Sequence, residues 1–220
     1  MTMVTIDAEM KAKCPRVALA CVTAEVVAEA TPAGLDDELR GCEEKILKLA
    51  EPKAVLEAAG ILATRAAYRA LGKDPARYRG SAEALLRRVI AGKGLPRINN
   101  VVDVINLVSV ESRLAVGLYD FANVQGDILF RAGRAGETYK GIGKYDLNLQ
   151  GLPVFCDAAG PHGSPTSDSE RTMVTLGTKQ VIAIIISFGG AEPLQRWGQQ
   201  MTELLQKYAS AKNIQLEITN

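Results

Sequence analysis

The spacing of apolar residues changes after about Glu111, and this change constrains the fold more than any other feature of the chain. Before that point, Val101, Ile105 and Val108 recur three or four residues apart, as they would on one face of a helix. After it, short apolar runs such as 116–119 and 181–186 are separated by glycine-rich turns, which is typical of strands. The order of these patterns predicts an α+β fold, with helices mainly in the N-terminal part packed on a mixed or antiparallel sheet.

A coarse assignment follows from the same periodicities. The helix over 35–50 has one apolar stripe that includes Leu35, Leu39 and Leu49, and Ser81 is expected to cap the helix that follows it. Further helices are expected over 55–71, 99–111 and 192–209, and strands over 16–29, 116–119, 127–131, 154–157, 172–176, 179–187 and 214–218. We expect residues 1–220 to form one domain, with turns at Pro32, Gly72 and Gly160.

The composition argues against several classes of protein. The four cysteines are scattered along the chain and His162 is the only histidine, so we expect reduced, buried thiols, no metal site and no cofactor. The longest apolar run, 181–186, is far too short to span a bilayer, and the N-terminal residues include acids and no apolar signal core. We therefore expect a cytoplasmic protein with no membrane partner.

The net charge is only +1, but its distribution is uneven. Residues 65–97 contain nine basic and two acidic side chains, which gives this segment a net charge of +7. Such a face can follow an RNA backbone, whereas nothing in the sequence suggests DNA. The alternative is a solvated pair of helices whose charges are balanced by acids elsewhere. The candidate RNA-binding residues are Arg77, Arg79, Arg87, Arg88 and Lys93.

The loop 160–171, with the sequence GPHGSPTSDSER, is the best candidate site in the chain. Its carboxylates, Asp168 and Glu170, are candidate catalytic residues because a carboxylate can orient an attacking water. Alternation along an extended DSER segment would place these two acids on one side. The candidate substrate-binding residues of the loop are Gly163, Ser164, Ser169 and Arg171. The alternative is a polar hairpin without a site. His162 is weak evidence for a general base, because no acid is placed by the sequence to orient it.

Three polar residues interrupt apolar runs and require hydrogen-bond partners if they are buried. We expect Asp103 to be structural, tying its helix to a neighbouring backbone amide. Asn106 and Asp120 are nearer the expected pocket and are candidate substrate-binding residues. For each of them a structural role is the alternative.

The order of these motifs resembles the B3/B4 module in the β subunit of bacterial phenylalanyl-tRNA synthetase, most clearly over residues 60–190. The segment from Ser81 resembles the family pattern S-P-E-x-L-x-x-R-L, and RINNVVDVINLV resembles R-x-I-N-N-V-V-D-V-T-N-Y-V. Residues 126–137 resemble G-D-I-x-x-R-x-A-x-x-G-E, and the loop at Gly163 lies where the family has a Gly-Gly loop. The resemblance implies a B3/B4-like fold and an activity that hydrolyses wrongly charged tRNA.

The polar residues that the family uses in its editing pocket are replaced in this chain. The resemblance places a Thr, a His and a Glu where this chain has Ile105, Gly117 and Ile185 or Ile186. Two hypotheses remain: an aminoacyl-tRNA deacylase that acts in trans, or a non-catalytic module that binds tRNA or an amino-acid-like ligand. A structural interaction domain is a third, weaker reading.

Overall fold

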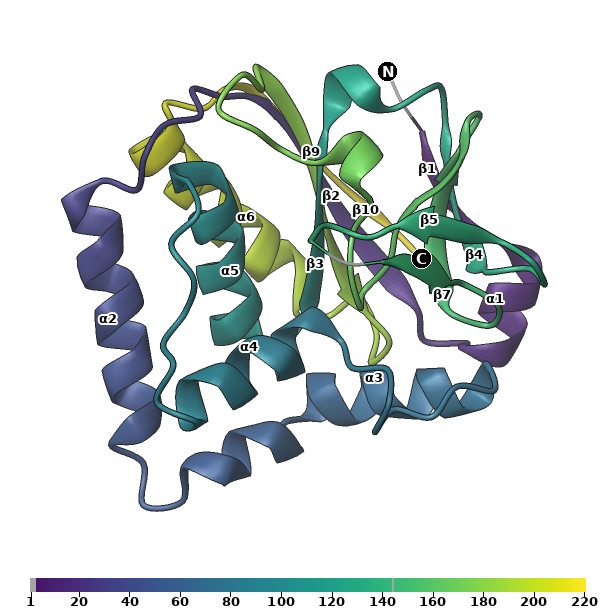
Figure 1. The fold of residues 1–220 in the computed structure, drawn as a ribbon, viewed down its shortest axis with the longest axis horizontal. Coiled ribbons are helices and arrows are strands. Elements are labelled where there is room, and N and C mark those ends of the chain that lie inside the picture. The colour runs from purple at the N-terminus through teal and green to yellow at the C-terminus, as the bar shows by residue number, and fades with distance from the viewer. Residues whose placement is uncertain (1–2, 144) are drawn as a thin grey trace.

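Two four-stranded sheets pack face to face in the computed structural model, which describes residues 3–143 and 145–220 (Figure 1). In the first sheet the strand order is β10-β2-β9-β3, and every neighbouring pair is antiparallel. This sheet consists of β2 (Ala18–Glu25), β3 (Ala115–Asp120), β9 (Gln180–Ser187) and β10 (Lys212–Thr219).

The second sheet is mixed. Its order is β1-β4-β7-β8, in which β1 and β4 are parallel and the other pairs are antiparallel. These strands are β1 (Val4–Ile6), β4 (Ile128–Ala132), β7 (Pro153–Asp157) and β8 (Gly160–Gly163), and a separate hairpin pairs β5 (Thr138–Lys140) with β6 (Asp146–Asn148).

Helices cover the face of the first sheet that points away from the second sheet (Figure 1). They are α2 (Ala33–Leu47), α4 (Ser81–Ile90), α5 (Asn100–Ser112) and α6 (Leu194–Ala209). The remaining helical segments are α1 (Ala8–Lys13), α3 (Ala59–Ala70) and the short 3-10 helices η1 (Pro52–Glu57), η2 (Phe121–Asn123) and η3 (Glu170–Thr172). The α+β class and the mixed or antiparallel sheet are therefore confirmed.

The sequence of β9 explains why the first sheet lies in the centre. Val181, Ala183 and Ile185 face the helices, whereas Ile182 and Ile184 face the second sheet. All of these side chains are fully buried. A strand that is buried on both faces is a continuous apolar run and not an alternating one, which accounts for the run at 181–186.

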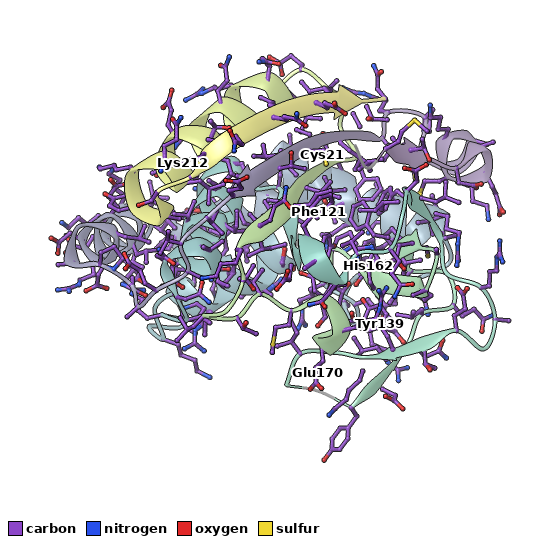
Figure 2. The ribbon with its side chains drawn as sticks, turned by 90° about the horizontal axis from the view of Figure 1, so that it is seen from above. Cys21, Phe121, Tyr139, His162, Glu170 and Lys212 are labelled. Atoms are coloured by element: carbon purple, nitrogen blue, oxygen red, sulfur yellow. The ribbon has the colours of Figure 1, made fainter. Side chains whose placement is uncertain are left out.

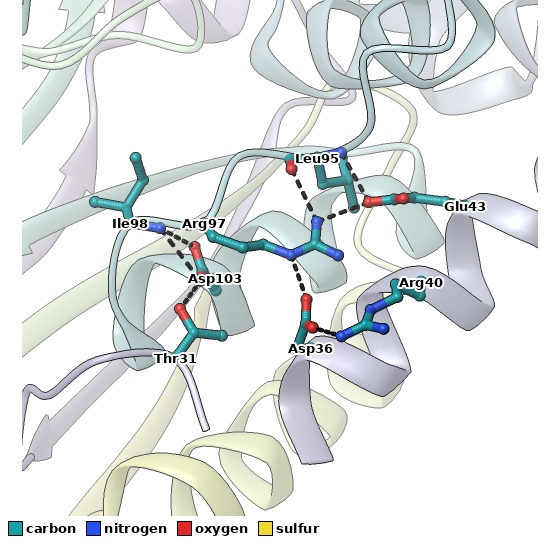
Figure 3. Close-up of polar contacts among 8 residues, drawn as sticks. All are labelled: Thr31, Asp36, Arg40, Glu43, Leu95, Arg97, Ile98 and Asp103. Carbon is teal, nitrogen blue, oxygen red and sulfur yellow. Dashed lines mark hydrogen bonds and ion pairs between the residues drawn. The ribbon is translucent and has the colours of Figure 1, made fainter. Parts of the chain in front are cut away.

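Hydrogen bonds fix the start of α5. Asn99 is its N-cap, and its side-chain oxygen accepts from the Val102 amide at 2.9 Å. The buried Asp103 accepts from the Ile98 amide at 3.0 Å and from the Thr31 hydroxyl at 2.5 Å (Figure 3). The predicted structural role of Asp103, tying its helix to a backbone amide, is confirmed.

Arg97 joins the segment before α5 to helix α2. Its guanidinium donates to the Asp36 carboxylate and to the Glu43 carboxylate, each at 2.7 Å (Figure 3). Acids of the N-terminal part therefore neutralise one residue of the basic segment, as the alternative reading of that segment expected.

Several predicted boundaries were wrong. Gly80, and not Ser81, is the N-cap of α4, and residues 55–71 are divided because η1 ends at Glu57 before α3 begins. No strand forms at 172–176, since η3 ends there and irregular chain follows. Leu49 lies beyond the end of α2 and is 45 % exposed. All four cysteines are buried and unpaired, as expected.

Candidate functional site

Tyr119 occupies a slot between two glycines, one from each sheet. It lies on the face of β3 that meets the second sheet, and it is fully buried. A Cβ atom at Gly117 would lie 2.2 Å from the Tyr119 hydroxyl oxygen, and one at Gly163 would lie 2.1 Å from it. Only glycine at both positions leaves room for this ring, so the tyrosine and the two glycines form one packing unit.

The Tyr119 hydroxyl holds the carboxylate of Asp168. It donates to Oδ1 at 3.0 Å, and the Leu118 amide is 3.5 Å from Oδ2. Because β3 is an edge strand that pairs only with β9, its outer amides are available to such a partner. Burial, together with the negative charge of Asp168, raises the pKa of Tyr119 well above its usual value. The phenol therefore remains protonated and donates.

The segment between Gly163 and Asp168 is fixed by two further tyrosines. The Tyr139 hydroxyl lies 2.5 Å from the Ser167 carbonyl oxygen and 3.0 Å from Ser164 Oγ. Ser164 Oγ also donates to the Ser167 carbonyl at 2.8 Å. The Tyr68 hydroxyl lies 2.7 Å from Thr166 Oγ1. The predicted site loop is thus built onto β5 and α3, and the candidate residue Ser164 is part of its framework.

His162 lies inside the molecule (Figure 2), and its ring packs against that of Tyr119. The two ring centroids are 4.5 Å apart and the planes are nearly perpendicular, at 88°. Neither ring nitrogen has a hydrogen-bond partner among the described residues. Burial lowers the pKa of His162 to about 4, although the nearby Asp157 carboxylate opposes this effect. The imidazole is neutral at pH 7 and is a side chain of the core. This agrees with the sequence analysis, which gave His162 little support as a general base.

The other polar residues of the loop bind partners of their own. Glu170 forms an ion pair with Lys140 at 2.9 Å and lies nearer the rim of the molecule than His162 does (Figure 2). Arg171 forms a two-point contact with the Asp157 carboxylate at 2.9 and 3.0 Å. The hydroxyl of the buried Ser169 lies 3.4 Å from that of Thr172. The DSER segment is not extended as we expected, because η3 begins at Glu170, and Asp168 and Glu170 consequently bind different partners.

The two candidates outside the loop lie on β3 and α5. Asp120 ends β3, where its carboxylate accepts from Thr178 Oγ1 at 2.7 Å and from the Ala122 amide at 3.1 Å. Both contacts are structural. Asn106 is half-buried on α5, which packs on the helical face of the first sheet, whereas Tyr119 lies on the opposite face.

The basic segment contacts the site loop at the start of α4. The Ser81 amide, at the start of α4, donates to the Pro165 carbonyl at 2.7 Å. The five candidate RNA-binding residues, Arg77, Arg79, Arg87, Arg88 and Lys93, are all exposed. Arg87 donates to the buried Glu83 at 2.8 Å, and Arg65 binds the same carboxylate. The Glu83 carboxylate thus neutralises part of this surface, and the start of α4 contacts the loop.

Comparison with known proteins gives the family. The sequence matches the family described as B3/4 domain over residues 63–208, which is well over half of the chain. The chain belongs to the B3/4 domain family. A solved structure of similar fold is an N-terminal fragment of the phenylalanyl-tRNA synthetase β-subunit from Pyrococcus horikoshii, with a TM-score of 0.53 and 16 % identity. The alignment covers 99 % of this chain and 50 % of that fragment, so this chain spans half the length of its structural relative. No curated protein matches the sequence.

In this B3/4 domain, the positions where the resemblance places Thr, His and Glu are apolar or filled. Ile105 and Ile185 belong to the core between the helices and the first sheet, and Ile186 belongs to the core between the sheets. At Gly117 the Tyr119 hydroxyl occupies the space of a side chain. Sequence reasoning did not identify Tyr119. Its only signal was a tyrosine two residues after one glycine, with a second glycine in the candidate loop.

Proposed function

We propose that this B3/4 domain hydrolyses the ester bond of aminoacyl-tRNA, acting in trans, with Asp168 as its general base. The observation that carries the proposal is the position of the Asp168 carboxylate. It is held by the Tyr119 hydroxyl at the edge of β3, beside the two glycines Gly117 and Gly163. The family membership supports it, and so do the exposed basic residues of the segment that contacts the loop through the Ser81 amide.

The proposed reaction needs one base and a bound ester. The Asp168 carboxylate takes a proton from a water molecule as the water oxygen attacks the ester carbonyl carbon. The bond between that carbon and the ribose oxygen then breaks, and the ribose oxygen takes the proton. A well-positioned ester requires little covalent help from the protein, so a nucleophile triad is not needed. Tyr119 acts as a positioning residue, since its hydroxyl fixes the orientation of the carboxylate.

The test is release of amino acid from a panel of charged tRNAs by the pure protein. Asp168→Asn retains an acceptor for Tyr119 and removes the base, so we expect release to fall at least about 100-fold. Glu170→Gln is the matched control, because Glu170 pairs with Lys140 and binds no part of the Tyr119 unit. Unchanged release by Asp168→Asn would rule out this base, and no release from any charged tRNA by the unmodified protein would rule out the activity.

A second function is favoured by one observation. The Tyr119 side chain fills the slot between the glycines, and the aligned editing positions are apolar, which suits a module that binds tRNA or an amino-acid-like ligand without hydrolysis. Salt-dependent tRNA binding with no release of amino acid would support this second reading.

A further inference from the structure

A cleft of about 420 Å³ lies where α2, α5 and α6 meet, on the helical side of the first sheet. Figure 1 shows these three helices side by side on that side of the molecule. The volume falls within the range of about 300–1,000 Å³ that is usual for small-ligand sites. The polar and aromatic residues that line it are Lys45, Glu111, Arg113, Arg196, Trp197 and Gln200. None of them belongs to the Tyr119 and Asp168 unit.

The cleft has an excess of positive charge. Three cations line it, Lys45, Arg113 and Arg196, against the single carboxylate of Glu111. That carboxylate already accepts a hydrogen bond from Gln200 Nε2 at 2.8 Å. Within residues 3–143 and 145–220, none of the three cations forms a salt bridge. With three cations and one carboxylate in its lining, the cleft has a net charge of +2 toward an entering anion.

Arg113 is an unusual residue for its position. It is the C-cap of α5 and has a left-handed backbone with φ of +63°. Glycine is the residue most often found there, because a side chain is strained in this conformation. Its Nη1 atom is buried and has no hydrogen-bond partner among the described residues. Arg113 lines the cleft, and it combines an unfavourable backbone geometry with an unsatisfied donor, which points to a role for the guanidinium itself.

An aromatic ring forms another part of the wall. The Arg196 guanidinium lies 5.2 Å from the centre of the Trp197 ring, which holds this cation at the cleft. Trp197 is the only tryptophan in the chain. Its emission will therefore report on this cleft alone.

We propose that this cleft binds a phosphate group, with Arg113 as its principal donor and Lys45 and Arg196 as supporting charges. A guanidinium presents paired N–H groups that match phosphate oxygens, which makes phosphate the anion that best fits an unpaired arginine. The phosphate is carried by a free nucleotide or by RNA, and both sources offer the same chemistry. The proposal does not rest on deacylation, since Asp168 takes no part in it.

The experiment is a titration of Trp197 fluorescence with inorganic phosphate, with adenosine monophosphate and with uncharged tRNA. We expect a saturable change with the phosphate-bearing probes and none with adenosine, which lacks the phosphate. Arg113→Gly suits the left-handed backbone, so it should fold normally and weaken phosphate binding at least about tenfold. Lys45→Gln is a second variant expected to weaken binding. Lys48→Gln is the control, because Lys48 follows Lys45 at the end of α2 but pairs with Glu44 and does not line the cleft.

The outcomes separate the sources and can overturn the proposal. Saturation by the nucleotide but not by tRNA identifies a free nucleotide, and the reverse identifies RNA. If no phosphate-bearing probe changes the emission, or if both Arg113→Gly and Lys45→Gln bind as the unmodified protein does, the proposal is wrong. Release of amino acid from charged tRNA is measured separately on the same proteins. Because that activity is proposed to depend on Asp168, its failure would not bear on phosphate binding in the cleft.

Discussion

Lowering the pH from 7 to 5 should destabilise this protein through His162. The imidazole is fully buried against Tyr119, with no partner for either nitrogen among the described residues, and burial lowers its pKa from 6.5 to about 4. A histidine whose folded pKa is depressed binds its proton more readily in the unfolded chain. The contribution of this histidine to the free energy of unfolding is therefore intact above about pH 6.5. It is lost progressively as the pH falls toward 4.

The size of the effect follows from the two pKa values. At pH 5 the unfolded imidazole is almost fully protonated and the folded one is about one-tenth protonated. The resulting loss of unfolding free energy is about 2 kcal/mol relative to pH 7. The carboxylate of Asp157 changes the stability little between pH 7 and pH 5. Burial acts to raise its pKa, but the hydrogen bonds from Arg171 lower that pKa below the usual 3.8. Its contribution is lost at lower pH.

Urea denaturation at pH 7 and pH 5, for the unmodified protein and for His162→Phe, isolates this group. Phenylalanine keeps a ring against Tyr119 and has no proton to bind. We expect the unmodified protein to lose about 2 kcal/mol more than the variant between the two pH values. Equal losses in the two proteins would refute the reasoning, because all other titrating groups are common to both.

Three other predictions concern the slot, the basic surface and the domain. Gly163→Ala should lower the free energy of unfolding, measured by urea denaturation, by about 2–3 kcal/mol, because the new Cβ would lie 2.1 Å from the Tyr119 hydroxyl. The control is Gly41→Ala, which has no atom within 4 Å of the new Cβ and should stabilise α2 slightly. The double variant Arg87→Glu, Arg88→Glu should bind tRNA more weakly and with a smaller salt dependence. The control with the same change of charge is Lys11→Glu, Lys13→Glu. Equal tRNA affinities in the two double variants would count against an RNA-binding role for the basic surface. Limited proteolysis should release no pair of independently stable fragments, and recovery of two folded fragments would contradict a single domain over residues 1–220.

The features that were predictable from sequence are those decided by local chemistry. The periodicity of Val101, Ile105 and Val108 identified α5, and a buried carboxylate one turn into that helix required a donor, which Ile98 supplies. The apolar run at 181–186 identified the strand β9. In each case the structure is determined by interactions and periodicity among residues that are close in the sequence.

The features that were missed depend on contacts between distant segments. No local pattern shows that Gly163 lies over Tyr119, because the two residues belong to different sheets that meet only in the folded chain. The alternation assumed for 168–171 failed because Arg171 is drawn to Asp157 on β7 and the chain turns into η3. Short strands such as β5 and β6 were missed because three residues are too few for a periodic pattern.

The order of strands in the first sheet determines when this chain can fold as it is made. Strand β2, at Ala18–Glu25, lies between β9 and β10, whose residues begin at Gln180 and Lys212. Both neighbours of an early strand are thus translated near the end of the described chain. Until then, the apolar faces of β2 have no sheet to join, and pairings this distant in sequence are slow to form. The nascent chain must therefore keep an apolar strand from premature association for most of its synthesis, a period in which chaperones commonly act.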